Sequence, residues 1–267
     1  MTDQAHIIVT HPDKEIGLLT LNRPEKRNAL DGVMIHEWIT VLQKMAKDKK
    51  IRVVILAGNG EHFCAGADIA WMQKMAKSTH VENVQDAMQL AILLKTIYTF
   101  PKPIIGLVQG AVMGGGLGVI ACCDIVLAAD NAVFCFSEAK MGLTPSVISP
   151  YVIPVIGERA ARYYYLTAEK FAVQQALELK LIQQIVTPVK LSATGLTLAR
   201  TLLQNSPHAL IEAKKLIRYI AAEKFSDKLI QFTAEHLADM RVFDDAKEGL
   251  NAFLEKRAPV WKSSVSS

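Results

Sequence analysis

The segment from Pro103 to Cys123 constrains the fold most, because it contains no charged residue over 21 positions. Such a run is long enough to cross a lipid bilayer as a helix. Six of its residues are glycines, however, and three of them are consecutive at 114–116, which makes a poor helix interior. We therefore expect a buried strand at Ile104–Val108, a glycine-rich loop and a short helix from about Gly115, rather than a membrane span.

Short apolar runs alternate with amphipathic segments of helical length over roughly the first 190 residues. Asp31 is well placed to cap the first of these helices, because its carboxylate can accept from free backbone N–H groups. Strands that alternate with helices predict an α/β fold. The expected strands are 6–9, 16–21, 52–57, 104–108 and 125–129, and the expected helices are 32–47, 67–75, 84–99 and one from about 115.

After Thr187 the pattern changes to helical periodicity with few interruptions. We expect helices at 193–203, 208–223, 226–240 and 244–255. The chain is accordingly divided into an α/β body, residues 1–190, and a C-terminal helical region, residues 191–267. Because these amphipathic helices have no obvious core of their own, they are expected to pack on the body or on other subunits, and an obligate oligomer is expected.

The composition is that of a globular chain, with 51% apolar residues and a net charge of +4 over 267 residues. So weak a net charge does not by itself indicate a nucleic-acid partner. One basic run leaves RNA binding as an alternative, although it has no interleaved aromatic residues and resembles the solvated end of a helix. It consists of Lys44, Lys47, Lys49, Lys50 and Arg52.

Cysteine and histidine spacing gives no sign of a metal site. The four cysteines, at 64, 122, 123 and 135, match neither a zinc arrangement nor a small disulfide framework. The seven histidines form no HxxxH or HExxH pair, and no serine lies in a GxSxG elbow. The first 17 residues include acids and lack the apolar core of a signal peptide, so a cytoplasmic location is expected.

Two loops that lead from a strand into a helix, His62–Asp68 and Gln109–Gly118, are rich in small residues. Small residues let a ligand approach the backbone, and free N–H groups at a helix start favour an anionic or developing oxyanion oxygen. A tight packing turn is the alternative for the first loop. The second contains a GxGxxA pattern at 116–121, but the following helix is too short for a dinucleotide-binding unit.

Glu138 lies in a largely apolar segment, 134–143. Desolvation there would raise the pKa of its carboxyl toward a value useful for proton transfer. Taken alone, the residue could also be a surface glutamate or a partner of Lys140.

Five segments, taken in order, resemble the enoyl-CoA hydratase/isomerase (crotonase) family, and the resemblance covers nearly the whole chain. They are LNRPEKRNAL at 21–30, FCAGADI at 63–69, KPIIGLVQGAVMGGG at 102–116, CDIVLAADNAVFCFSE at 123–138 and AFLEKRAPVW at 252–261. Within the family, residues 136–169 are most similar to bacterial methylglutaconyl-CoA hydratases. The resemblance implies a spiral of ββα units and a C-terminal helical region that builds trimers, commonly paired as hexamers.

The resemblance also implies a site for an acyl-CoA thioester, with no metal and no cofactor apart from the CoA of the substrate. The backbone N–H groups of Ala67 and Gly115 would form an oxyanion hole, and Glu138 would transfer protons. Lys256 would reach a phosphate of CoA bound to a neighbouring subunit. The other implied CoA contacts are Lys26, Arg27, Ala29, Ala65, Asp68 and Ile69.

Two positions depart from the family pattern. Hydratases of this family commonly carry a first catalytic glutamate where this chain has Gly118, and a lysine often stands where it has Ala70. The expected reaction is hydration of the C2=C3 bond of a short, branched 2-enoyl-CoA. Because a lone carboxylate also suits double-bond isomerases, an enoyl-CoA isomerase with Glu138 as sole base is the alternative.

Overall fold

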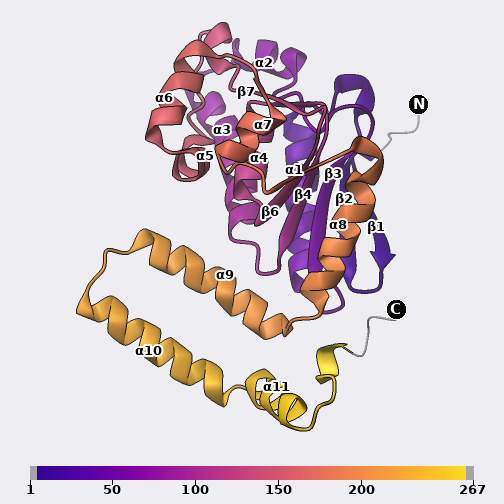
Figure 1. Ribbon diagram of the computed structural model, residues 1–267. Coiled ribbons are helices and arrows are strands. Elements are labelled where there is room, and N and C mark those ends of the chain that lie inside the picture. The colour runs from indigo at the N-terminus through magenta and orange to yellow at the C-terminus, as the bar shows by residue number, and fades with distance from the viewer. Residues whose placement is uncertain (1–4, 263–267) are drawn as a thin grey trace.

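The computed structural model describes residues 5–262, and its main element is a sheet of six strands in the order β1-β2-β3-β4-β6-β9 (Figure 1). The first two strands are antiparallel, and every later neighbour is parallel. Residues 1–4 of the N-terminal segment and residues 263–267 of the expected C-terminal region lie outside the described residues. The strands are β1 Ile7–Asp13, β2 Ile16–Leu21, β3 Val53–Gly58, β4 Ile104–Val108, β6 Ile125–Ala129 and β9 Gln184–Val186.

A second, smaller sheet is built from β5 (Ala111–Met113), β7 (Val133–Cys135) and β8 (Phe171–Ala172). The chain passes from β4 in the large sheet to β5 in the small one, then through helix α4 (Gly115–Cys122) to β6 and β7. Because β6 pairs with β4 and β7 pairs with β5, successive turns of the chain stack on each other. This is the expected spiral of ββα units. The uncharged segment 103–123 thus forms two strands and a short helix.

The large sheet is covered by helices on both faces, because alternate residues of each strand point to opposite sides. On one face, strand residues such as Val54 and Leu56 share a core with Trp38 of α1 (Gly32–Lys47) and with Leu93 of α3 (His80–Tyr98). On the other face, strand residues such as Ile55 pack against α8 (Pro188–Leu203). Helix α8 therefore crosses the expected boundary at residue 190 and contributes Leu191, Ala199 and Leu203 to that second core.

The remaining helices of the body lie mostly around the small sheet, and sequence analysis missed α5, α6 and α7. Prolines interrupt the apolar periodicity of α5, which contains Pro150 and Pro154. Helices α6 and α7 are short, with ten and six residues. Among residues 5–262, no helix combines the length and the apolar character that a bilayer span requires. These helices are α2 Ile69–Met75, α5 Ser149–Ile156, α6 Glu158–Thr167 and α7 Val173–Glu178, with 3-10 turns at Pro24–Lys26, Glu138–Met141 and Val260–Lys262.

The last three helices, α9 (Pro207–Ala222), α10 (Asp227–Val242) and α11 (Asp244–Leu254), extend away from the body as a separate layer (Figure 1). Neither α9 nor α10 has a buried residue, and α11 has one, Ala252. Polar contacts hold this layer to the body. The Nζ of Lys214 on α9 donates to Asp124 Oδ2 at 2.6 Å and to the Lys102 carbonyl at 2.7 Å.

Arg52, just before β3, is a second link between the body and the end of the chain. Its Nη1 donates to Glu15 Oε1 and to the Trp261 carbonyl, both at 3.1 Å. Its Nη2 donates to the carbonyls of Leu203, at 3.0 Å, and Asn205, at 2.8 Å. One guanidinium therefore joins the hairpin, the end of α8 and the C-terminal segment.

Candidate active site

Ala67 and Gly115 lie on two different loops and line the same cavity. A parallel bridge brackets Ala67, because the Leu30 N–H donates to the Gly66 carbonyl and the Asp68 N–H to the Leu30 carbonyl, each at 2.8 Å. Gly115 is the first residue of α4, where N–H groups have no partner within the helix. Within residues 5–262, neither the Ala67 nor the Gly115 N–H donates to a protein acceptor. Both remain available to an oxygen atom of a ligand.

Gly114 brings the second loop close to an acid. Its backbone has φ 46° and ψ −114°, a conformation that only glycine adopts readily. A Cβ at this position would lie 3.2 Å from Glu138 Oε1 and 3.9 Å from the Gly66 Cα. The two loops and the Glu138 carboxylate therefore converge within a few ångströms.

Glu138 begins a 3-10 turn after β7 and is half-buried. Within the described residues, its Oε2 is buried and has no hydrogen-bond partner. Burial raises the pKa of this carboxyl above its ordinary value, as expected from the apolar sequence around it. A carboxyl group with a raised pKa and an unpartnered oxygen is suited to accept a proton and to return it.

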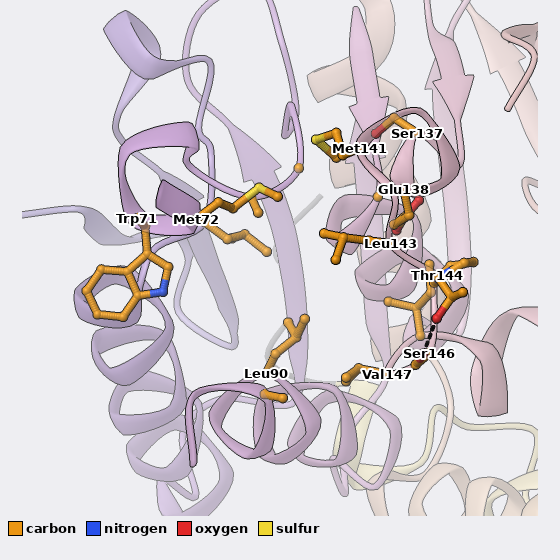
Figure 2. Close-up of a pocket in the computed structure, with 18 of the residues that line it drawn as sticks. Trp71, Met72, Leu90, Ser137, Glu138, Met141, Leu143, Thr144, Ser146 and Val147 are labelled. Atoms are coloured by element: carbon orange, nitrogen blue, oxygen red, sulfur yellow. Dashed lines mark hydrogen bonds between the residues drawn. The ribbon is translucent and has the colours of Figure 1, made fainter. Parts of the chain in front are cut away.

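Ala67, Gly115 and Glu138 all line one cavity of about 360 Å³. Figure 2 shows Trp71 and Met72 of α2 on one side of it and Glu138, Leu143 and Thr144 on the other. Its lining is mainly apolar, as in most sites for small organic groups. The larger lining side chains are Leu30, Ile35, Ile69, Trp71, Met72, Leu90, Met141, Leu143, Val147 and Ile148.

A second, more open cavity of about 550 Å³ adjoins the first and shares Ala65, Ala67 and Ile69 with it. Two cations, Lys26 and Arg27, line this cavity together with two acids, Glu25 and Asp68, and Asp68 is paired with Arg23. The two cations could contact the phosphates of an anionic ligand. The structure thus brings six of the expected CoA contacts around one groove. They are Lys26, Arg27, Ala29, Ala65, Asp68 and Ile69.

Asp68 also has a structural task that sequence analysis did not anticipate. Its Oδ1 accepts from the N–H groups of Ala70 and Trp71, so Asp68 caps α2, and the expected helix at 67–75 begins at Ile69 instead. Arg23 Nη2 donates to its Oδ2 at 3.1 Å. Burial alone would raise the pKa of Asp68, but these hydrogen bonds hold it below its ordinary value. Ala67 therefore lies before the helix and is not its first residue.

Lys256 lies apart from the other expected contacts. It follows α11 in the layer that extends from the body, and it lines neither of the two cavities described above (Figure 1). A single chain therefore does not bring this lysine to the groove.

Gly118 lies inside the core, at the position where family hydratases commonly have a first glutamate. A Cβ added there would lie 2.4 Å from Ile148 Cγ2 and 3.3 Å from Leu94 Cδ1. The side chain of Ile148 thus occupies the space into which a longer residue would extend. Glu138 is left as the only expected catalytic carboxylate at this site.

The alternatives from the sequence find less support in the geometry. Of the five basic residues considered for RNA, Arg52 directs its guanidinium at protein acceptors. The GxGxxA pattern lies within α4, which has only eight residues, as short as expected. Cys64 lies beside the N–H loops, but burial raises the pKa of its thiol to about 12, so it is not a nucleophile at neutral pH.

Comparison with known proteins agrees with this geometry. The model of the enoyl-CoA hydratase/isomerase family matches residues 12–264. The chain therefore belongs to the enoyl-CoA hydratase/isomerase family and is an enzyme of that superfamily.

Among solved structures, an enoyl-CoA hydratase from Shewanella pealeana is 42% identical, with a TM-score of 0.93 over 97% of each chain. A protein from Legionella pneumophila described as an enoyl-CoA hydratase/isomerase (crotonase) is 43% identical, with a TM-score of 0.91 over 96% of this chain and 99% of that one. The mevalonyl-coenzyme A hydratase sidH of Aspergillus fumigatus is 32% identical over 99% of both chains.

Proposed function

We propose that this enzyme hydrates the C2=C3 double bond of a short, branched 2-enoyl-CoA. The observation that carries the proposal is that one largely apolar cavity is lined by Ala67 and Gly115, whose N–H groups have no protein acceptor within the described residues, and by Glu138, whose buried Oε2 has no hydrogen-bond partner there. The adjoining groove with Lys26 and Arg27 would hold the anionic CoA. Relatives with names of hydratases support the reaction type.

The geometry suggests how the residues would divide the work. The N–H groups of Ala67 and Gly115 would hold the thioester oxygen and stabilise the negative charge that develops on it as C3 is attacked. Glu138 would accept a proton from water as the water oxygen bonds to C3, and would return a proton to C2. Apolar walls would exclude other water and strengthen these interactions.

The test is Glu138→Gln, followed by the loss of absorbance of the conjugated thioester over a panel of branched and linear enoyl-CoAs. Turnover should fall by roughly 10²–10⁴ if proton transfer is the contribution of this residue. KM should change far less, because backbone N–H groups hold the thioester. Glu158→Gln, on the exposed face of α6, is the matched control. Near wild-type hydration by the Glu138 variant would refute the mechanism.

A second candidate reaction, shift of a double bond from C3 to C2, is favoured by one observation. Ile148 fills the place of a second carboxylate, and a single base can move a proton between C4 and C2. Supplying a 3-enoyl-CoA separates the reactions, because isomerisation creates the conjugated absorbance that hydration removes. Gly118→Glu should not raise hydration, since the new side chain meets Ile148.

We also propose that the active form is a trimer or a pair of trimers in the cytoplasm, without a nucleic-acid partner. The exposed helices α9–α11 and the remote Lys256 support assembly, and four free cysteines within the described residues fit a reducing compartment. Sedimentation would give the stoichiometry, and Lys256→Ala should raise KM for acyl-CoA. A salt-dependent RNA complex lost on charge reversal at Lys44–Lys50 would support RNA binding instead.

A further inference from the structure

The cavity of about 360 Å³ that Glu138 lines has negatively charged residues in its wall and no positively charged ones among residues 5–262. Two acids, Glu138 and Asp86, line it, and within residues 5–262 no lysine, arginine or histidine does. A ligand carboxylate that enters a largely apolar space loses hydration, and this loss needs a cation or several donors to offset it. A carboxylate at the far end of the acyl chain would therefore meet no opposite charge in the cavity wall.

Asp86 is held in place by a contact between two helices. It lies on α3 and is half-buried, and its Oδ1 accepts from Trp71 Nε1 of α2 at 2.9 Å. Both residues line the cavity. Lys74 of α2 lies with its Nζ 4.9 Å from the centroid of the Trp71 ring and does not line the cavity.

The opposite wall is uncharged apart from Glu138. Its polar groups include the hydroxyls of Thr144 and Ser146, which are 2.6 Å apart and hydrogen-bond to each other, as Figure 2 shows. Leu90 and Val147 close the same end of the cavity. A branched hydrocarbon chain would find apolar surface here, whereas a terminal carboxylate would find Asp86 and only the one hydroxyl hydrogen that the Thr144–Ser146 hydrogen bond does not use.

We propose that this cavity selects an uncharged, branched acyl chain, and that Asp86 excludes acyl chains ending in a second carboxylate. The inference rests on the proposed function only in placing the acyl chain in this cavity. It narrows the substrate class, because methylglutaconyl-CoA, suggested by the sequence resemblance, carries such a carboxylate. Specificity would then come from an unfavourable charge pair against the wrong ligand as well as from apolar contact with the right one.

The experiment is a calorimetric titration of the assembled wild-type enzyme with isovaleryl-CoA and with 3-methylglutaryl-CoA. The two saturated ligands share the methyl branch and differ by one terminal carboxylate, and neither can be hydrated. Isovaleryl-CoA should bind at least about tenfold more tightly.

Two variants separate charge from shape. Asp86→Asn keeps an acceptor for Trp71 and removes the charge. The ratio of the Kd of 3-methylglutaryl-CoA to that of isovaleryl-CoA should therefore shrink several-fold. Trp71→Phe removes the donor and keeps the charge. The ratio of the two Kd values should therefore persist even if both ligands bind more weakly.

Three results would overturn the inference. The first is that 3-methylglutaryl-CoA binds as tightly as isovaleryl-CoA or more tightly. The second is an unchanged ratio of the two Kd values in Asp86→Asn. The third is tight binding of 3-methylglutaryl-CoA that Thr144→Val abolishes, which would assign the hydroxyl pair to carboxylate recognition. Failure of both acyl-CoAs to bind would overturn the proposed function as well, whereas equal binding overturns this inference alone.

Discussion

Helices α1 and α9 have the same length, 16 residues each, and opposite environments. Six residues of α1 are buried, including Trp38 and Leu42, whereas no residue of α9 is. Both sequences are amphipathic, so each predicts a helix with an apolar face. The α1 face is covered by the sheet and α3, and the α9 face keeps Ile217 68% exposed.

The comparison shows that an apolar helical face predicts burial without naming the partner that provides it. For α1 the partner is in the same chain. For α9, α10 and α11 the described residues supply chiefly polar links, and we propose that other subunits cover the apolar faces. Packing within the body is thus expected to stabilise the fold of a single chain. Contacts made by the C-terminal helices are expected to stabilise the assembly of several chains.

Truncation should have the largest effect on stability, and it tests separately what the body and the C-terminal helices contribute. A chain that ends at Val189 loses the α8 residues Leu191, Ala199 and Leu203 from the second core. Burial of three such residues is worth roughly 3–9 kcal/mol, comparable with the net stability of a domain, so an insoluble or inactive product is expected. A chain that ends at Asn205 keeps α8 and should fold but not assemble, as light scattering would show. A soluble, active monomer that ends at Val189 would contradict the division.

Paired alanine substitutions test the comparison directly. Leu42→Ala removes a fully buried side chain of α1 and should cost about 2–5 kcal/mol of unfolding free energy. Ile217→Ala on α9 should cost less than about 0.5 kcal/mol in urea unfolding at low protein concentration. At high concentration the same variant should weaken assembly. Equal costs at low concentration would mean that α9 is already covered within one chain.

The link between α9 and the body should be worth less. Lys214→Met removes the hydrogen bonds to Asp124 and the Lys102 carbonyl, at a cost of about 1–3 kcal/mol for the docking of α9. Hydrogen exchange should then increase in α9 while the strands keep their protection. Lys215→Met, which breaks only an exposed pair with Glu212, is the control and should change little. Uniform loss of protection across the body would contradict a local link.

The smallest effect concerns Glu138. Burial raises the pKa of this carboxyl above 4.5, so the folded state binds its proton more tightly than the unfolded state does. Stability from this group is present at low pH and is lost as the pH rises through the raised value. Glu138→Gln should therefore raise Tm by about 1–3 °C near pH 8 and leave it unchanged near pH 4. A lower Tm at pH 8 would show that the ionised carboxylate stabilises the fold.

Much of the body could be predicted because its signals are local. The strands at 104–108 and 125–129 and the helix at 32–47 have the expected bounds, since each is an apolar or amphipathic run with a clear cap or turn. Strands β5, β7, β8 and β9 were missed. They have only two or three residues, and periodicity over so short a run indicates nothing.

The candidate site divides in the same way. Ala67, Gly115 and Glu138 could be singled out because each lies in a recognisable segment. The hydrogen bond between Trp71 and Asp86 could not, since two residues on different helices meet only in the folded chain. Nor could the position of Ile148 over Gly118, which depends on how the loop before α5 packs on α4. Contacts of this kind shape the cavity, and they have no signature in sequence spacing.

The sequence separation between Arg52 and its partners limits the order in which its hydrogen bonds can form. The carbonyl of Trp261 that its Nη1 meets belongs to a residue 209 positions later, so this bond can form only after all the residues between them have been made. Its other partners come earlier in the chain: Glu15 is only 37 positions away, and the carbonyls of Leu203 and Asn205 are 151 and 153 positions away. Closure of so long a loop contributes little to early folding. The C-terminal segment around Trp261 is therefore expected to dock on Arg52 only after the helices between them have been made.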